Sequence, residues 1–176
     1  MAQSHELRSF DYVNRPYAEV AAALRARGDE IFARATAGAT DRAKELATTL
    51  RVQIAGVEVG TPITLDIVHV DEEPTDTSAG PTLHMKLEWS AKHNPVWFPV
   101  MDARLDVYAL SSEETQLDFH GFYRAPFGVL GQVLDAVAGH RVAEASVHRF
   151  VQDLARFLRD ELGKRKEAGQ RLSASP

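Results

Sequence analysis

The stretch that decides the fold runs from Gly139 to Leu162 and reads GHRVAEASVHRFVQDLARFLRDEL. Apolar side chains recur in it every three or four residues, which is the spacing of one face of an α-helix. The residues that share this face are Val147, Phe150, Val151, Leu154, Phe157, Leu158 and Leu162. The charged residues mostly occupy the remaining arc. We therefore predict a long amphipathic helix, which needs a broad apolar surface to lie on.

Most of the preceding chain alternates between apolar and polar residues, the period of two that is typical of β-strands. The alternation is clearest in TLHMKLEWS (82–90), MDARLDVYAL (101–110) and TQLDFHGFYR (115–124). It is also present in ITLDIVHV (63–70) and LRVQI (50–54), and LRSFDYV (7–13) is suited to a first strand. Strands with one dry and one charged face indicate an antiparallel sheet with one solvated side.

Short helices are expected between the first strand and the others. Asn14 and Pro16 suit a helix start, and Gly28 suits the joint between one helix and the next. Gly38 and Thr40 mark a further break or weak point, after which DRAKELA (41–47) continues as helix, and another short helix is expected over residues 129–139. We predict a single domain over residues 1–163, followed by a flexible C-terminal tail over residues 164–176.

The composition excludes several classes of function. A net charge of −5 over 176 residues argues against nucleic acid as the main partner, because phosphate binding needs concentrated Lys and Arg. The chain has no cysteine, which excludes disulfides, thiolate metal sites and cysteine nucleophiles. No apolar run approaches the roughly 20 residues of a membrane-spanning helix. We expect a cytoplasmic protein that needs no cofactor.

The order of these elements resembles the helix-grip fold of the START-like, or SRPBCC, superfamily, which includes polyketide cyclase-like proteins. The resemblance covers roughly Leu7 to Leu162. It is carried by FDYVNRPYAEV (10–20), ETQLDFHGFYRAP (114–126) and GVLGQVLDAVAGHRVAEASVHRFVQDLARFL (128–158). The resemblance implies an α+β fold in which a curved antiparallel sheet wraps around a long C-terminal helix. It also implies a cavity between the two that holds a lipid, a polyketide or another largely apolar molecule.

The inward-facing parity of the strands and the helix predicts which residues line such a cavity. These ligand-binding candidates are Ile67, His69, Leu87, Trp89, Leu105, Phe119, Tyr123, Phe150, Leu154 and Phe157. An apolar pocket with a few polar groups is the usual form of a small-molecule site. Binding of a small apolar ligand is therefore the first hypothesis.

Two alternatives stay open. A cyclase or dehydratase would need polar side chains, such as His69 and Tyr123, to converge inside the cavity. An interaction protein, acting as a homodimer rather than a monomer, would use exposed apolar residues such as Tyr108, Phe122 or the segment 96–98. His140, Glu144 and His148 are spaced four residues apart, so they lie in one stripe along the predicted terminal helix. We interpret that stripe as solvated or part of an interface rather than as a metal site.

Overall fold

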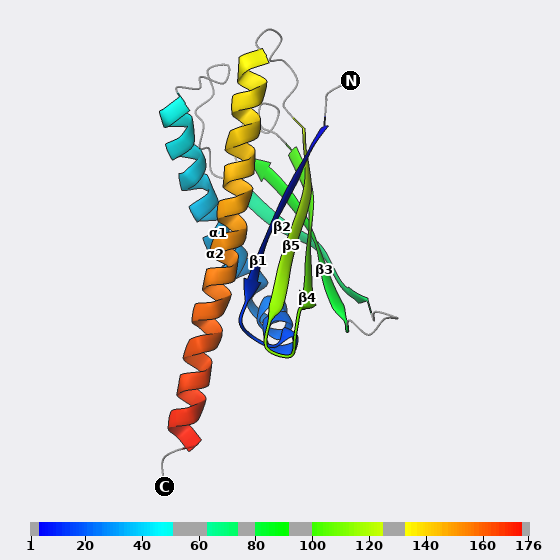
Figure 1. Ribbon diagram of the computed structural model, residues 1–176, viewed down its shortest axis with the longest axis vertical. Coiled ribbons are helices and arrows are strands. Elements are labelled where there is room, and N and C mark those ends of the chain that lie inside the picture. Colours follow the sequence, from blue (N-terminus) through cyan, green and yellow to red (C-terminus); the bar gives the residue numbers. More distant parts are fainter. Residues whose placement is uncertain (1–3, 51–62, 74–79, 92–99, 125–132, 174–176) are drawn as a thin grey trace.

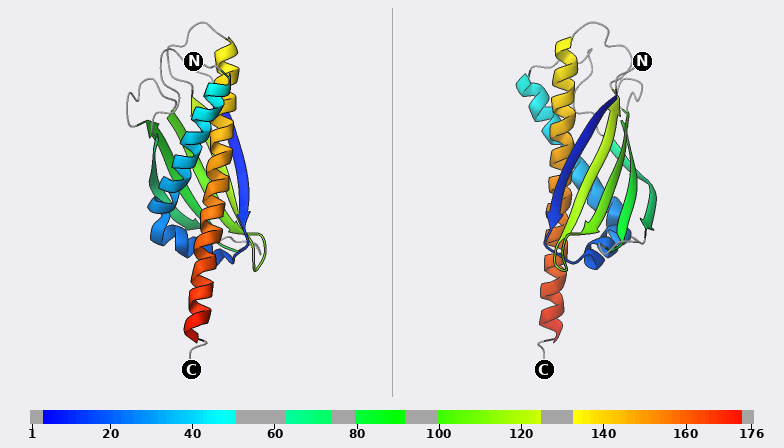
Figure 2. Two further views of the ribbon diagram at one scale, coloured as in Figure 1. Left: turned by 90° about the vertical axis from the view of Figure 1, so that its left-hand side faces the viewer. Right: turned by 45° about the vertical axis from the view of Figure 1, so that its right-hand side comes forward.

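The computed structural model describes residues 4–50, 63–73, 80–91, 100–124 and 133–173. Figure 1 shows the elements in chain order: β1 (Ser4–Val13), α1 (Tyr17–Leu50), β2 (Ile63–Glu73), β3 (Thr82–Ala91), β4 (Val100–Ala109), β5 (Thr115–Arg124) and α2 (Val133–Ser173). The strands form one antiparallel sheet in the order β1-β5-β4-β3-β2. Both helices lie side by side over one face of this curved sheet (Figure 2). The predicted α+β helix-grip arrangement is confirmed.

Strands β3, β4 and β5 place their apolar residues on the face that the helices cover. The register sets Met85 opposite Leu105, and Leu105 opposite Phe119, so the dry faces of the three strands coincide. All three side chains are buried. The alternation in the sequence therefore predicted the faces of the central strands correctly.

Strand β1 shows which of its two parities faces inward. Leu7 and Val13 are buried beneath the helices, whereas Phe10 and Tyr12 lie exposed on the opposite face. The sequence alone does not separate these two parities, because both contain large apolar residues. Packing against α2 decides between them, since α2 lies directly over β1.

Helix α1 is longer than the sequence predicted. Its backbone leaves helical geometry at Arg27, with φ −140° and ψ 23°, one residue before the predicted joint at Gly28. The helix then continues through Gly38 to Leu50, so the predicted break at Gly38 is wrong. A Cβ atom at position 38 would lie 3.2 Å from Cγ of Asp153 and closer still to its carboxylate oxygen. Gly38 therefore serves the close approach of α2 rather than a turn.

Helix α2 is continuous from Val133 to Ser173. The predicted separate short helix over residues 129–139 is therefore wrong, because its described part belongs to α2. The sequence contains no proline between these bounds, so nothing forces a break, and Gly139 is accommodated within the helix. The C-terminal part of α2 extends past the end of the sheet (Figure 1).

Several predicted segments fall outside the described residues. The strand predicted over residues 50–54 lies outside them apart from Leu50, which ends α1. The connection over residues 92–99, which contains the predicted contact segment 96–98, also lies outside them. In the part of the chain that is described, neither helix contains a stretch long and apolar enough to cross a membrane.

Candidate functional site

The space between sheet and helices is the candidate site, and three phenylalanine rings stand at its centre. Phe119 comes from β5, Phe150 from α2 and Phe32 from α1, and each is fully buried. The Phe32 and Phe150 rings are stacked with centroids 5.9 Å apart. The Phe119 and Phe150 rings meet edge to face at 6.0 Å. Both separations are in the range of favourable aromatic pairs.

The helices approach the sheet mainly at its two edges. Helix α2 packs along β1, and helix α1 packs along β2, whereas the central strands β3, β4 and β5 are approached much less closely. The two helices also pack against each other. Side chains from the sheet and from both helices fill the region over the central strands, among them those of Phe32, Phe119 and Phe150.

The edge along β1 is held by polar contacts. The His5 and His140 rings lie 5.4 Å apart, and the Ser9 hydroxyl lies 3.3 Å from Nδ1 of His148. The His140–Glu144–His148 stripe of α2 is therefore partly an interface with the edge strand, although Glu144 and His148 remain exposed. Among the described residues, no group of three metal-ligating side chains could hold an ion.

The opposite edge is closed by a cluster of Tyr17, Arg25 and Glu72. The Tyr17 hydroxyl donates to Oε1 of Glu72 at 2.6 Å, and the Arg25 guanidinium lies 2.7 Å from Oε2. Burial, followed by the hydrogen bond to Glu72, raises the pKa of Tyr17 to about 12. The hydrogen bonds from Tyr17 and then Arg25 lower the pKa of Glu72. This cluster ties the start of α1 to the edge strand β2.

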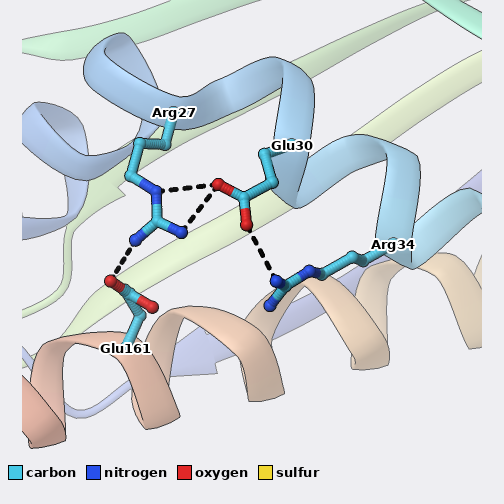
Figure 3. Close-up of polar contacts among 4 residues, drawn as sticks. All are labelled: Arg27, Glu30, Arg34 and Glu161. Carbon is cyan, nitrogen blue, oxygen red and sulfur yellow. Dashed lines mark hydrogen bonds and ion pairs between the residues drawn. The ribbon is translucent and has the colours of Figure 1, made fainter.

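A second polar cluster lies at the kink of α1 (Figure 3). The Arg27 guanidinium donates to Glu30 at 2.7 and 3.0 Å and also bonds Glu161 of α2. Arg34 reaches the other oxygen of Glu30 at 2.8 Å. The hydrogen bond from Arg27 lowers the pKa of Glu30. The kink is thus linked to both the following turns of α1 and to α2.

A buried carboxylate of α2 lies where the two helices approach each other closely. Asp153 of α2 is only 3% exposed and faces α1 at Gly38. Arg149 and Arg156, from the same helix, lie 2.9 and 2.7 Å from its two oxygens. Sequence reasoning missed this residue. Its signal was an acidic side chain next to the apolar stripe, with arginines four residues before and three residues after it.

The structure brings together most of the predicted ligand-binding residues. Those that are buried in the common core are Leu87, Leu105, Phe119, Phe150 and Leu154. Ile67 and Phe157 are partly buried and pack against the border of this core. The side chains of Trp89 and Tyr123 lie outside the described part of the structure.

His69 does not face the interior, so its predicted orientation is wrong. The pairing of β2 with β3 shifts between Ile67 and His69, which places His69 opposite Lys86 rather than on the side of Ile67. The His69 side chain is 67% exposed, and its Nε2 lies 2.9 Å from Asp71. A β-bulge adds one residue to a strand and so reverses the faces that follow. The sequence pattern contained no sign of this bulge.

Most buried polar side chains of the described residues have local partners, but the buried Nδ1 of His140 has no hydrogen-bond partner. Thr36 donates to the Phe32 carbonyl and Thr115 to the Arg15 carbonyl, each at 2.8 Å. Asp153 is paired with arginines at the helix interface. In this part of the chain the interior therefore offers mainly apolar contact surface. His69, one of the two polar residues that the enzyme hypothesis places inside the cavity, faces outward instead.

Comparisons with known proteins give structural likeness only. No family model and no curated protein matches the sequence. Similar solved structures include Ara h 8.0201, with 11% identity, a TM-score of 0.42, and coverage of 89% of this chain and 98% of that one. The Zhui aromatase/cyclase from Streptomyces sp. R1128 has 13% identity, a TM-score of 0.39, and coverage of 93% and 96%. A protein of unknown function from Staphylococcus aureus has 10% identity, a TM-score of 0.43, and coverage of 93% and 98%. Likeness at this level carries no argument about activity, and the helix-grip arrangement rests on the topology of the chain itself.

Proposed function

We propose that this chain binds a small, largely apolar ligand in the space between the central strands and the two helices. The observation that carries the proposal is the position of the helices, which rest on the edge strands β1 and β2 and approach the central strands much less closely. A lipid, a polyketide or an aromatic metabolite has the apolar character that such a space accepts. No catalytic step is part of the proposal.

The chemistry of the enclosed side chains supports this class of ligand. The rings of Phe32, Phe119 and Phe150 come from three separate elements and meet over the sheet. An uncharged apolar ligand would replace contacts among such side chains without leaving a buried charge unpaired. Ile67 lies at the border of the core, beside Gly28 of α1, and so marks one edge of the proposed site.

Binding can be measured with the neutral fluorescent probe N-phenyl-1-naphthylamine. We expect its emission to rise on saturable, one-to-one binding to the wild-type protein, and we expect the bound probe to be displaced by a medium-chain fatty alcohol. Organic extraction of the purified protein followed by mass spectrometry gives an independent readout of a ligand that is retained from the host cell.

A matched pair of variants on β2 locates the site. Ile67→Trp adds bulk at the border of the core, and His69→Trp adds the same bulk on the outer face of the same strand. We expect Ile67→Trp to weaken probe binding about tenfold, the effect of a misfit worth about 1.4 kcal/mol. His69→Trp should bind like the wild type. Equal affinities for all three proteins, or no saturable binding, would overturn the proposal.

A further inference from the structure

The uncovered face of the sheet carries its charges in rows that run across the strands. No described element lies over this face (Figures 1 and 2). The pairing register aligns one basic side chain from each of the five strands in a single line, which we call the cationic row. In the order of the sheet, from β1 to β2, the cationic row consists of Arg8, His120, Arg104, Lys86 and His69.

An acidic row flanks the cationic row on each side. Each row lies two residues away along the strands, a step of about 7 Å. The first acidic row contains Glu6, Asp102 and Glu88, with Phe122 between the first two. The second acidic row contains Asp118, Asp106 and Asp71, with Phe10 on β1 and His84 on β3 in the same line.

This arrangement places like charges opposite one another on neighbouring strands, which by itself destabilises a sheet. Ion pairs between the rows offset the repulsion within the molecule. Arg8 lies 2.9 Å from Glu6, and Arg104 lies 2.9 Å from Asp106. The result is a striped face rather than a face of one charge. Such a face is complementary to a copy of itself that is displaced by one row.

Large apolar side chains lie on the same face. Phe10 is 66% exposed, Phe122 47% and Tyr12 46%, and all three lie on the neighbouring strands β1 and β5. Five strands about 4.8 Å apart and about 33 Å long present roughly 700 Å². Each partner in a standard protein interface buries about 800 Å². The face therefore approaches the size of one side of a dimer interface, and Phe10 and Phe122 are the large apolar side chains nearest its cationic row.

We propose that this face binds a second copy of the chain. The two copies face each other across a two-fold axis that lies between the two sheets and runs parallel to the rows. When this axis passes midway between the cationic row and the first acidic row, the cationic row of each copy lies over the first acidic row of the other. Arg104 then faces Asp102 of the other copy, and Lys86 faces its Glu88. Because the axis is two-fold, every such pair occurs twice.

The acidic rows also distinguish this occupant from a polyanion. A nucleic acid or an anionic lipid surface on the cationic row would meet carboxylates on both sides, about 7 Å away. Among the side chains of the described outer face, the cations are too narrowly confined to one row to form a broad basic patch. The second copy is the occupant whose charges follow the same stripes.

Sedimentation velocity at 1–100 µM protein tests the proposal with a charge exchange. Arg104→Glu and Asp102→Arg each place like charges opposite each other in a homodimer, twice per interface. We expect each variant alone to raise the dimer dissociation constant about 100-fold or more. When the two variants are mixed, opposite charges face each other again, and we expect a heterodimer with an affinity near that of the wild-type dimer.

Arg34→Glu is the matched control, because Arg34 is an exposed arginine on α1, away from this face. It should leave the dimer unchanged, and circular dichroism should show that all variants are folded. A wild-type protein that stays monomeric at 100 µM would overturn the proposal. So would folded exchange variants that do not associate when mixed, or binding of the wild-type protein to anionic vesicles in place of self-association.

Discussion

Replacing Gly38 by alanine tests how closely the two helices must approach. In an exposed helix this change would stabilise the protein by about 1 kcal/mol, because alanine has the higher helix propensity. Here the new Cβ would lie 3.2 Å from Cγ of Asp153 and overlap its carboxylate oxygen. That carboxylate is buried and held by Arg149 and Arg156, so it has little room to move.

The overlap outweighs the helix propensity. Overpacking costs about 1–3 kcal/mol, and shifting the buried Asp153 away from its arginines adds to this cost. We expect Gly38→Ala to lower the free energy of unfolding by about 2 kcal/mol, which at this chain length lowers Tm by roughly 4–8 °C. Urea unfolding followed by circular dichroism at 222 nm measures the change.

Two further variants separate overlap from other causes. At Gly163 of α2 a Cβ would meet only Nη2 of Arg15 at 3.6 Å, an ordinary contact, so Gly163→Ala should stabilise by about 0.5–1 kcal/mol. Asp153→Ala leaves two exposed arginines in water and should cost about 1 kcal/mol or less. In the double variant with Gly38→Ala it should recover most of the loss. If Gly38→Ala stabilises the protein as Gly163→Ala does, the reasoning fails.

Further predictions concern buried rings and pH. Phe119→Ala should destabilise by about 3–5 kcal/mol, whereas Phe122→Ala on the outer face of the same strand should change stability by less than about 1 kcal/mol, as urea unfolding will show. The pKa of Tyr17, raised to about 12 from 10.0, means that its stabilising contribution is complete below pH 10 and is lost as pH rises toward 12. Tyr17→Phe should therefore reduce the fall in the free energy of unfolding between pH 10 and pH 12. An unchanged fall over this range would contradict the assignment. The lowered pKa of Glu72 means that its contribution is present above its ordinary pKa of 4.5 and is lost as pH falls through the folded value; Glu72→Gln should reduce stability at pH 7 and leave it unchanged at pH 2.

The sequence predicted the sheet and the terminal helix because their patterns are local. In β3, β4 and β5 apolar residues such as Leu105 and Phe119 alternate with charged ones, so the sequence indicates which face of each strand is buried. The spacing of Phe150 and Leu154 likewise has one helical face. Five of the ten candidate site residues are buried together in the core for this reason.

The errors come from interactions that the local pattern does not contain. The bulge in β2 depends on pairing with β3, so the sequence of β2 alone placed His69 on the wrong face. Gly38 looked like a helix break, but it is required by Asp153, which is more than 100 residues away in the chain. The cationic row was also not visible, because it exists only once the register of all five strands is known.

The most direct test of ligand binding in the interior is an NMR titration with N-phenyl-1-naphthylamine. Selectively labelled phenylalanine rings report the location, because Phe119 and Phe150 face the interior, whereas Phe10 and Phe122 lie on the outer face of the sheet. The proposal predicts saturable shifts and intermolecular NOEs at Phe119 and Phe150, with Phe10 and Phe122 unaffected. Shifts confined to Phe10 and Phe122, or no saturable shift of any ring, would contradict it.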